Sequence, residues 1–135
     1  MSYDLGVWYP TERLTNAQAT QVYIKLCEGD TATVTPNPAV DAFYEELTGI
    51  HPEIDDTPEE KLEECPWNVA FDRSPGHIIM CCAWSRSEYC LDLVWSIAQK
   101  HGLALFDPQS ETIVYPDGSS GDEPPPSKKP WWKFW

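Results

Sequence analysis

The stretch His-Ile-Ile-Met-Cys-Cys-Ala-Trp, residues 77–84, decides the fold class because it is an unbroken apolar run of strand length. Such a run between turn signals is typical of a strand covered on both faces of a sheet. Directly before it, Arg-Ser-Pro-Gly at residues 73–76 has the composition of a turn. The segment Trp-Asn-Val-Ala-Phe-Asp at residues 67–72 predicts a partner strand. The centre of the chain is therefore predicted to form a β-hairpin.

A helix is predicted directly after this hairpin. Ser85 and Glu88 have the spacing of a capping box, and apolar residues then recur at helical intervals. The helix is expected to run to His101, whose imidazole suits the carbonyl end of the helix dipole. Short strands are predicted over residues 103–106 and 112–115, separated by a turn.

The N-terminal part of the chain predicts one strand and two helices. Apolar and polar residues alternate over residues 3–9, the period of a half-buried strand. Apolar residues at i, i+3, i+4 and i+7 predict helices over residues 15–28 and 38–48. Thr15 begins a capping box for the first helix, and Asn37 is the expected N-cap of the second.

The predicted element order is β-α-α-β-β-α-β-β, which indicates an α+β domain over residues 1–116. Without the second helix and the last strand, the order is the β-α-β-β-α-β of the ferredoxin-like, or split βαβ, arrangement. Right-handed crossovers then place the helices on one face of an antiparallel sheet. The second helix and the C-terminal strand are additions to that frame. A different α+β sandwich is the alternative.

The composition limits the classes of function. The 135 residues include 22 acidic and 9 basic side chains, for a formal net charge of −13. Nucleic-acid binding needs a basic surface, so we expect no nucleic-acid partner. No apolar run approaches the roughly 20 residues of a membrane span. Residues 1–10 lack the basic and apolar regions of a signal peptide, which predicts a cytoplasmic protein.

The cysteines and the known catalytic motifs give no sign of enzymatic chemistry. The five cysteines are odd in number and show no C-x-x-C spacing, so we expect small buried side chains rather than disulfides or a metal site. Phosphate-binding loops and the G-x-S-x-G and H-E-x-x-H motifs do not occur in the sequence. Arg73, Arg86 and His77 flank the hairpin and are expected to be turn and cap residues. We therefore assign no catalytic residue and no cofactor, and an enzyme of unknown class stays the minor alternative.

Acidic residues are densest at residues 51–66, a segment predicted to be mostly loop. A face of this charge favours a basic protein partner, such as a toxin domain whose surface normally meets phosphate, because the field speeds association. A solvated, solubilising loop is the alternative. The candidate partner-binding residues here are Glu53, Asp55, Asp56, Glu59, Glu60, Glu63 and Glu64, against the single Lys61.

The composition changes after Pro116. Residues 117–130 are rich in Pro, Gly and Ser, which predicts a linker. Residues 131–135 form an aromatic tail motif beside three lysines. The tail is expected to dock on a larger assembly, to cap its own domain, or to make weak contact with an anionic membrane surface. The candidate contact residues are Trp131, Trp132, Phe134 and Trp135.

Three motifs carry a resemblance to a known group of proteins. They are Tyr3-Asp4-Leu5-x-Val7-Trp8-x-Pro10, Phe43-Tyr44-x-x-Leu47 and His101-Gly102-Leu103-x-Leu105-Phe106-Asp107-Pro108-Gln109. In combination they resemble a family of small, largely uncharacterised bacterial proteins. That family is similar to the immunity-type proteins found beside polymorphic or contact-dependent toxins. The resemblance covers residues 1–116 and implies a non-enzymatic protein that neutralises a cognate toxin by binding it. The family supplies no catalytic residues for this chain. Its shared pattern does not include the acidic segment at residues 51–66 or the aromatic tail.

Overall fold

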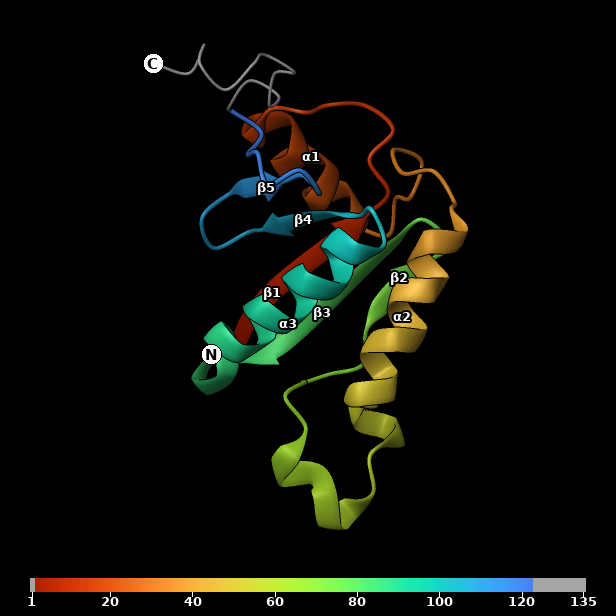
Figure 1. The fold of residues 1–135 in the computed structure, drawn as a ribbon, viewed down its shortest axis with the longest axis vertical. Coiled ribbons are helices and arrows are strands. Elements are labelled where there is room, and N and C mark those ends of the chain that lie inside the picture. The colour runs from red at the N-terminus through yellow and green to blue at the C-terminus, as the bar shows by residue number, and fades with distance from the viewer. Residues whose placement is uncertain (1, 123–135) are drawn as a thin grey trace, which may run out of the picture.

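The computed structural model describes residues 2–122 and shows an α+β fold built on one antiparallel sheet (Figure 1). The five strands lie in the order β2-β3-β1-β4-β5. The strands are β1 (Ser2–Trp8), β2 (Asp72–Ser74), β3 (His77–Ala83), β4 (Ala104–Asp107) and β5 (Thr112–Val114). The α-helices are α1 (Asn16–Cys27), α2 (Pro38–Ile50) and α3 (Ser87–Lys100). Three short 3-10 helices are η1 (Ile54–Asp56), η2 (Glu59–Glu64) and η3 (Trp84–Arg86).

The centre of the sheet is β1, which pairs with β3 on one side and β4 on the other, both antiparallel. Its residues from Leu5 to Trp8 are buried, so this strand is covered on both faces. The strand predicted from residues 77–84 is its neighbour β3, in which Ile78 and Met80 are fully buried. The α+β class and the antiparallel sheet are confirmed.

The helices lie on both faces of the sheet, so the prediction of helices on one face is wrong. On one face α2 and α3 pack against Leu5 and Val7; on the other, α1 packs with Trp8 and Phe106. The reason is that β1 and β4 carry apolar side chains on both faces of the sheet, and each apolar face is stabilised by a helix packed against it. The helix that departs from the one-face arrangement is the first, not the second (Figure 1).

Capping explains where two of the helices start. Thr15 forms the predicted capping box with Gln18, and the Asn37 side chain accepts from the Ala39 N–H, as expected. The predicted box of Ser85 and Glu88 is wrong, because α3 starts after η3 and its N-cap, Arg86, makes no side-chain cap. Ser85 lies in the 3-10 turn η3 and Glu88 in the first turn of α3, so the N-cap falls one position later than predicted.

The strand predicted over residues 67–72 is also mostly wrong. Only Trp67 forms an isolated bridge with Cys82 before the short strand β2 begins at Asp72. The Phe71 N–H donates to the carboxylate of Glu53, and the Trp67 indole donates to the His51 carbonyl. Before β2, hydrogen bonds from this segment to β3 occur only at its start, where the Asn68 N–H donates to the Cys81 carbonyl at 2.8 Å, and Trp67 and Phe71 bond to the acidic segment instead.

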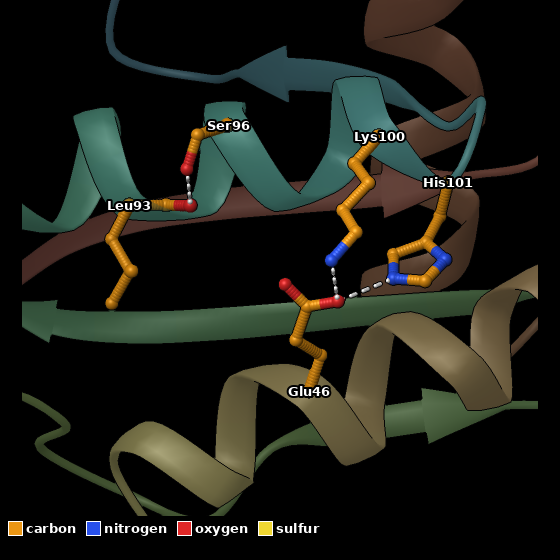
Figure 2. Close-up of polar contacts among 5 residues, drawn as sticks. All are labelled: Glu46, Leu93, Ser96, Lys100 and His101. Atoms are coloured by element: carbon orange, nitrogen blue, oxygen red, sulfur yellow. Dashed lines mark hydrogen bonds and ion pairs between the residues drawn. The ribbon is translucent and has the colours of Figure 1, made fainter.

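An ion-pair cluster joins α2 to the end of α3. Glu46 Oε1 lies 2.9 Å from Lys100 Nζ and 2.9 Å from His101 Nε2 (Figure 2). These contacts lower the pKa of the Glu46 carboxyl, through the hydrogen bond to Lys100 first and then that to His101. His101 is the C-cap of α3, as its predicted position at the helix end requires, and its imidazole contacts the neighbouring helix.

The packed body extends to Asp122. Ser119 is buried, its hydroxyl accepts from Arg13 Nη2 at 2.7 Å, and the Gly121 N–H donates to the Ile113 carbonyl at 2.8 Å. Residues 117–122, the start of the predicted linker, thus lie against α1 and β5. The rest of that linker, residues 123–130, and the aromatic tail lie outside the described residues. Among the helices of residues 2–122, none has the length and apolar character needed to cross a membrane.

Candidate functional site

The acidic segment forms a lobe that projects from the sheet. This acidic lobe, residues 51–66, follows α2 directly and contains η1 and η2. In Figure 1 it is the yellow-green segment at one end of the long axis, beyond the C-terminal end of α2. The structure therefore brings the acidic candidates together on one protruding element.

Six of the seven acidic candidates are exposed on this lobe. Within residues 2–122 the described ion pairs involve Glu46 and Asp72, and none of these six carboxylates takes part in one. Unpaired negative charges on one small element produce a concentrated local field. The six are Asp55, Asp56, Glu59, Glu60, Glu63 and Glu64.

Glu53, the seventh candidate, has a different place. It is half-buried, and its carboxylate accepts hydrogen bonds from the Tyr44 hydroxyl and, at 2.7 Å, from the Phe71 N–H. The bond to Glu53 also raises the pKa of the Tyr44 hydroxyl, as the largest of its causes. Glu53 therefore holds the lobe to the body and is less exposed than the other six.

Main-chain contacts fix the rest of the lobe. Trp67, which is 1% exposed, donates from its indole Nε1 to the His51 carbonyl at 3.0 Å. Arg86 donates to the Glu64 carbonyl at 2.9 Å and to the Glu63 carbonyl at 3.2 Å. Both ends of the lobe are thus tied to the sheet region, and the carboxylates sit on a held backbone rather than on a free loop.

A pocket of about 670 Å³ lies where the lobe meets α2 and α3. This lobe pocket falls within the size range of about 300–1,000 Å³ that is usual for ligand sites. Three separate stretches of the chain line it: Gly49, Ile50, His51, Pro52, Thr57, Pro58, Lys61, Glu64, Cys65, Arg86 and Tyr89. Most of these residues were not singled out from the sequence, because no local pattern joins residues 49–52, 57–65 and 86–89.

One wall of the lobe pocket is a hydrogen-bonded pair of rings. His51 Nε2 lies 2.6 Å from the Tyr89 hydroxyl, and the two rings meet edge to face with their centroids 5.5 Å apart. Burial, and then the charge of Arg86, lower the pKa of the His51 imidazole. A neutral imidazole thus faces the pocket near neutral pH, and the positive charges of the lining come from Arg86 and Lys61.

The polar groups beside the β2–β3 hairpin serve the turn, as predicted for His77. His77 is 1% exposed, with Nδ1 2.6 Å from the Ser74 hydroxyl and Nε2 3.7 Å from Asp72 Oδ1. The Gly76 N–H donates to the same hydroxyl at 3.2 Å. Ser74 and His77 thus bond within a four-residue turn. The guanidinium of Arg73 instead stacks over the Tyr44 ring, 3.6 Å from its centroid.

Among the cysteines of residues 2–122, only Cys65 belongs to the lobe pocket. Cys82 and Cys90 are buried, as predicted, but the prediction is wrong for the other three. Cys27 is exposed, and Cys65 and Cys81 are half-buried, with Cys65 in the lining of the lobe pocket. In this part of the chain no three His, Cys, Asp or Glu side chains are placed to hold a metal ion. The tail candidates Trp131, Trp132, Phe134 and Trp135 lie outside the described residues.

Comparison with known proteins gives no relative. The chain matches no protein-family model, no curated protein and no solved structure.

Proposed function

We propose that this chain is a non-enzymatic protein-binding protein whose acidic lobe contacts a basic surface of its partner. The observation that carries the proposal is the set of six exposed, unpaired carboxylates on a lobe whose backbone is held at both ends. Most concretely, we propose a bacterial cytoplasmic immunity protein that neutralises a cognate toxin by covering its basic surface. The motif resemblance supports the immunity function.

The rigidity of the lobe matters for this proposal. A field of one sign steers an oppositely charged partner and raises association rates by about 10–10³-fold. When the charges sit on a held backbone, less conformational entropy is lost on binding. The hydrogen bonds of Arg86 to the lobe carbonyls and of Trp67 to His51 give this preorganisation.

For the frame of the fold we propose the ferredoxin-like, split βαβ arrangement, with α1 and β5 as additions. Two observations support it: α2 and α3 share one face of the sheet, and β1 pairs antiparallel with both β3 and β4. The lobe then lies within the connection that leads from α2 to β2.

Quantitative capture tests the proposed function. Full-length tagged protein is compared with a lobe variant in which the six exposed carboxylates are changed to amides, Asp55→Asn and Glu59→Gln being examples. A matched variant carries as many amides at exposed acids elsewhere: Glu12, Glu28, Asp41, Glu45, Asp92 and Glu111. Each is used to recover partners from the cells that naturally make the protein, and recovered proteins are quantified by mass spectrometry.

We expect wild type and the matched variant to recover one dominant basic protein, and the lobe variant to recover about tenfold less of it. Equal recovery with the lobe variant would contradict the proposal. A third variant, with Trp131, Trp132, Phe134 and Trp135 changed to Ser, tests the tail. If only this variant failed to recover the partner, the tail and not the lobe would be the binding site, which would favour an adaptor function.

A further inference from the structure

The lobe pocket presents apolar surface to solvent. Ile50 is 49% exposed and Tyr89 is 46% exposed, and both belong to the pocket lining, with Pro52 and Pro58 beside them. Burying such surface is favourable by roughly 25 cal/mol per Å². A ligand of this pocket therefore brings apolar or aromatic side chains.

The charges around the pocket narrow the ligand further. Lys61 and Arg86 lie in the lining, and a cation over an aromatic face is favourable, most of all with Trp. Glu64 also belongs to the lining, and the other exposed carboxylates of the lobe precede it within nine positions of the sequence. These carboxylates favour a ligand that carries positive charges beside its aromatic groups. The pocket thus fits a peptide segment that combines tryptophans with lysines.

We propose that residues 128–135 of a second copy of this chain occupy the lobe pocket. The segment is Lys-Lys-Pro-Trp-Trp-Lys-Phe-Trp, with three lysines, four aromatic side chains and no acidic residue. Its aromatic groups enter the pocket against Ile50 and Tyr89, and its lysines meet the carboxylates of the lobe. Trp is the residue type most often found as the anchor of an interface.

Chain geometry favours the second copy over the same chain. Residues 117–122 lie beside α1 and β5, at the end of the long axis opposite the acidic lobe, and the whole of α2 lies between them (Figure 1). The 13 residues of α2 span about 20 Å. Lys128 is six residues beyond Asp122, and six residues reach at most about 20 Å when fully extended. To reach the lobe of its own chain, the tail would therefore have to lie extended along the whole length of α2, whereas the tail of a second copy meets the lobe without this constraint.

This contact is heterologous, because the tail of one copy meets the pocket of the next. Such contacts repeat head to tail, so the assembly grows with concentration unless a ring closes. The tail and a basic partner also compete for the same lobe. The inference does not rest on the proposed function, since self-association and partner capture are measured separately.

Sedimentation of the full chain over a wide concentration range tests the inference. We expect the average mass to rise with concentration for wild type, and to stay at one chain for the tail variant with serines at its four aromatic positions. Ile50→Asp, which places a charge on the exposed pocket wall, should weaken association by about tenfold or more. Ile24→Asp, at another exposed apolar position, on α1, is the matched control and should associate like wild type.

Mixing isotopically light and heavy chains before crosslinking identifies which copy supplies the tail. The inference predicts light–heavy crosslinks between residues 128–135 and the lobe. A mass of one chain at every concentration would overturn it, as would crosslinks confined to single chains or full association by Ile50→Asp. If self-association behaves as expected while the lobe variant still captures the partner, only the proposed function fails.

Discussion

The carboxylate of Glu53 accepts a hydrogen bond from the hydroxyl of Tyr44, nine positions earlier on α2. The same carboxylate accepts from the Phe71 N–H, so one side chain joins α2, the acidic lobe and the segment that leads to β2. Its neighbours in the sequence, such as Glu59 and Glu60, are exposed. Within one acidic stretch, Glu53 therefore stabilises the lobe, whereas residues such as Glu59 and Glu60 are exposed on its surface.

This division predicts unequal effects of single substitutions on stability. Glu53→Ala removes the charged acceptor of two hydrogen bonds, from the Tyr44 hydroxyl and the Phe71 N–H. This should lower the free energy of unfolding by about 1.5–3 kcal/mol. Glu59→Ala, at an exposed position of the same lobe, should change it by less than about 0.5 kcal/mol. Urea denaturation of the full chain measures both. Equal values for the two variants would show that Glu53 does not anchor the lobe.

The buried His77 predicts a loss of stability in mild acid. Burial lowers the pKa of its imidazole below the ordinary value of 6.5, and the Asp72 carboxylate opposes this only in part. Below pH 6.5 the unfolded chain therefore takes up a proton that the folded chain does not, so the free energy of unfolding falls as the pH falls.

His51 adds to this effect, because burial also lowers its pKa. His77→Gln should lower stability at neutral pH by removing the contact with Ser74, yet flatten the dependence on pH below 6.5. The double variant with His51→Gln should show the smallest slope. Denaturation curves recorded at several pH values measure it. An unchanged slope in both variants would mean that neither imidazole stays neutral in the fold.

Glu46 predicts a second effect at lower pH. Its folded pKa lies below the ordinary 4.5 because Lys100 and His101 contact the carboxylate (Figure 2). The stabilisation is therefore complete above pH 4.5 and is lost as the pH falls through the folded pKa. Glu46→Gln should be less stable than wild type at neutral pH, and the two should converge in acid. Glu45→Gln, exposed one position earlier, is the control and should follow wild type at every pH.

Gly121 predicts that the packed body includes residues 117–122. A Cβ at this position would lie 2.6 Å from Asn16 Oδ1 and 2.6 Å from Ile113 Cγ2, so Gly121→Ala requires α1 and β5 to move. We expect a loss of about 1–3 kcal/mol in the free energy of unfolding. Gly49→Ala, where nothing lies within 4 Å, should be neutral or stabilising by up to about 1 kcal/mol. If both variants unfolded like wild type, these residues would not belong to the body.

The sequence predicted those parts of the fold that depend on local chemistry. The capping box of Thr15, the cap by Asn37 and the strand over residues 77–83 follow from neighbouring residues, and the structure confirms them. The predicted cover on both faces of that strand is only partly right, because Ile79, Cys81 and Ala83 are half-buried. The placement of α1 on the far face was not predicted, because it depends on which side of β1 and β4 is left uncovered by α2 and α3. That information lies in contacts between distant segments.

The same limit applies to the site. The charge of the acidic lobe is visible in the composition of residues 51–66, but the role of Glu53 depends on Tyr44 and Phe71, which belong to other segments. Tyr89 and His51 meet across 38 positions of sequence. A sequence pattern can therefore indicate an acidic surface, whereas the pocket beneath it appears only when α2, the lobe and α3 are brought together.

The most direct test of the central claim, that the exposed carboxylates of the lobe drive association, is the association rate with the captured partner as a function of salt. Steering by these charges predicts a rate for wild type and the matched variant that falls steeply as ionic strength rises. At low salt, the association rate of the lobe variant should be lower than that of wild type by a factor of about ten or more, and it should depend little on salt. If the lobe variant showed the same rate and the same salt dependence as the matched variant, the acidic lobe would not be the binding face.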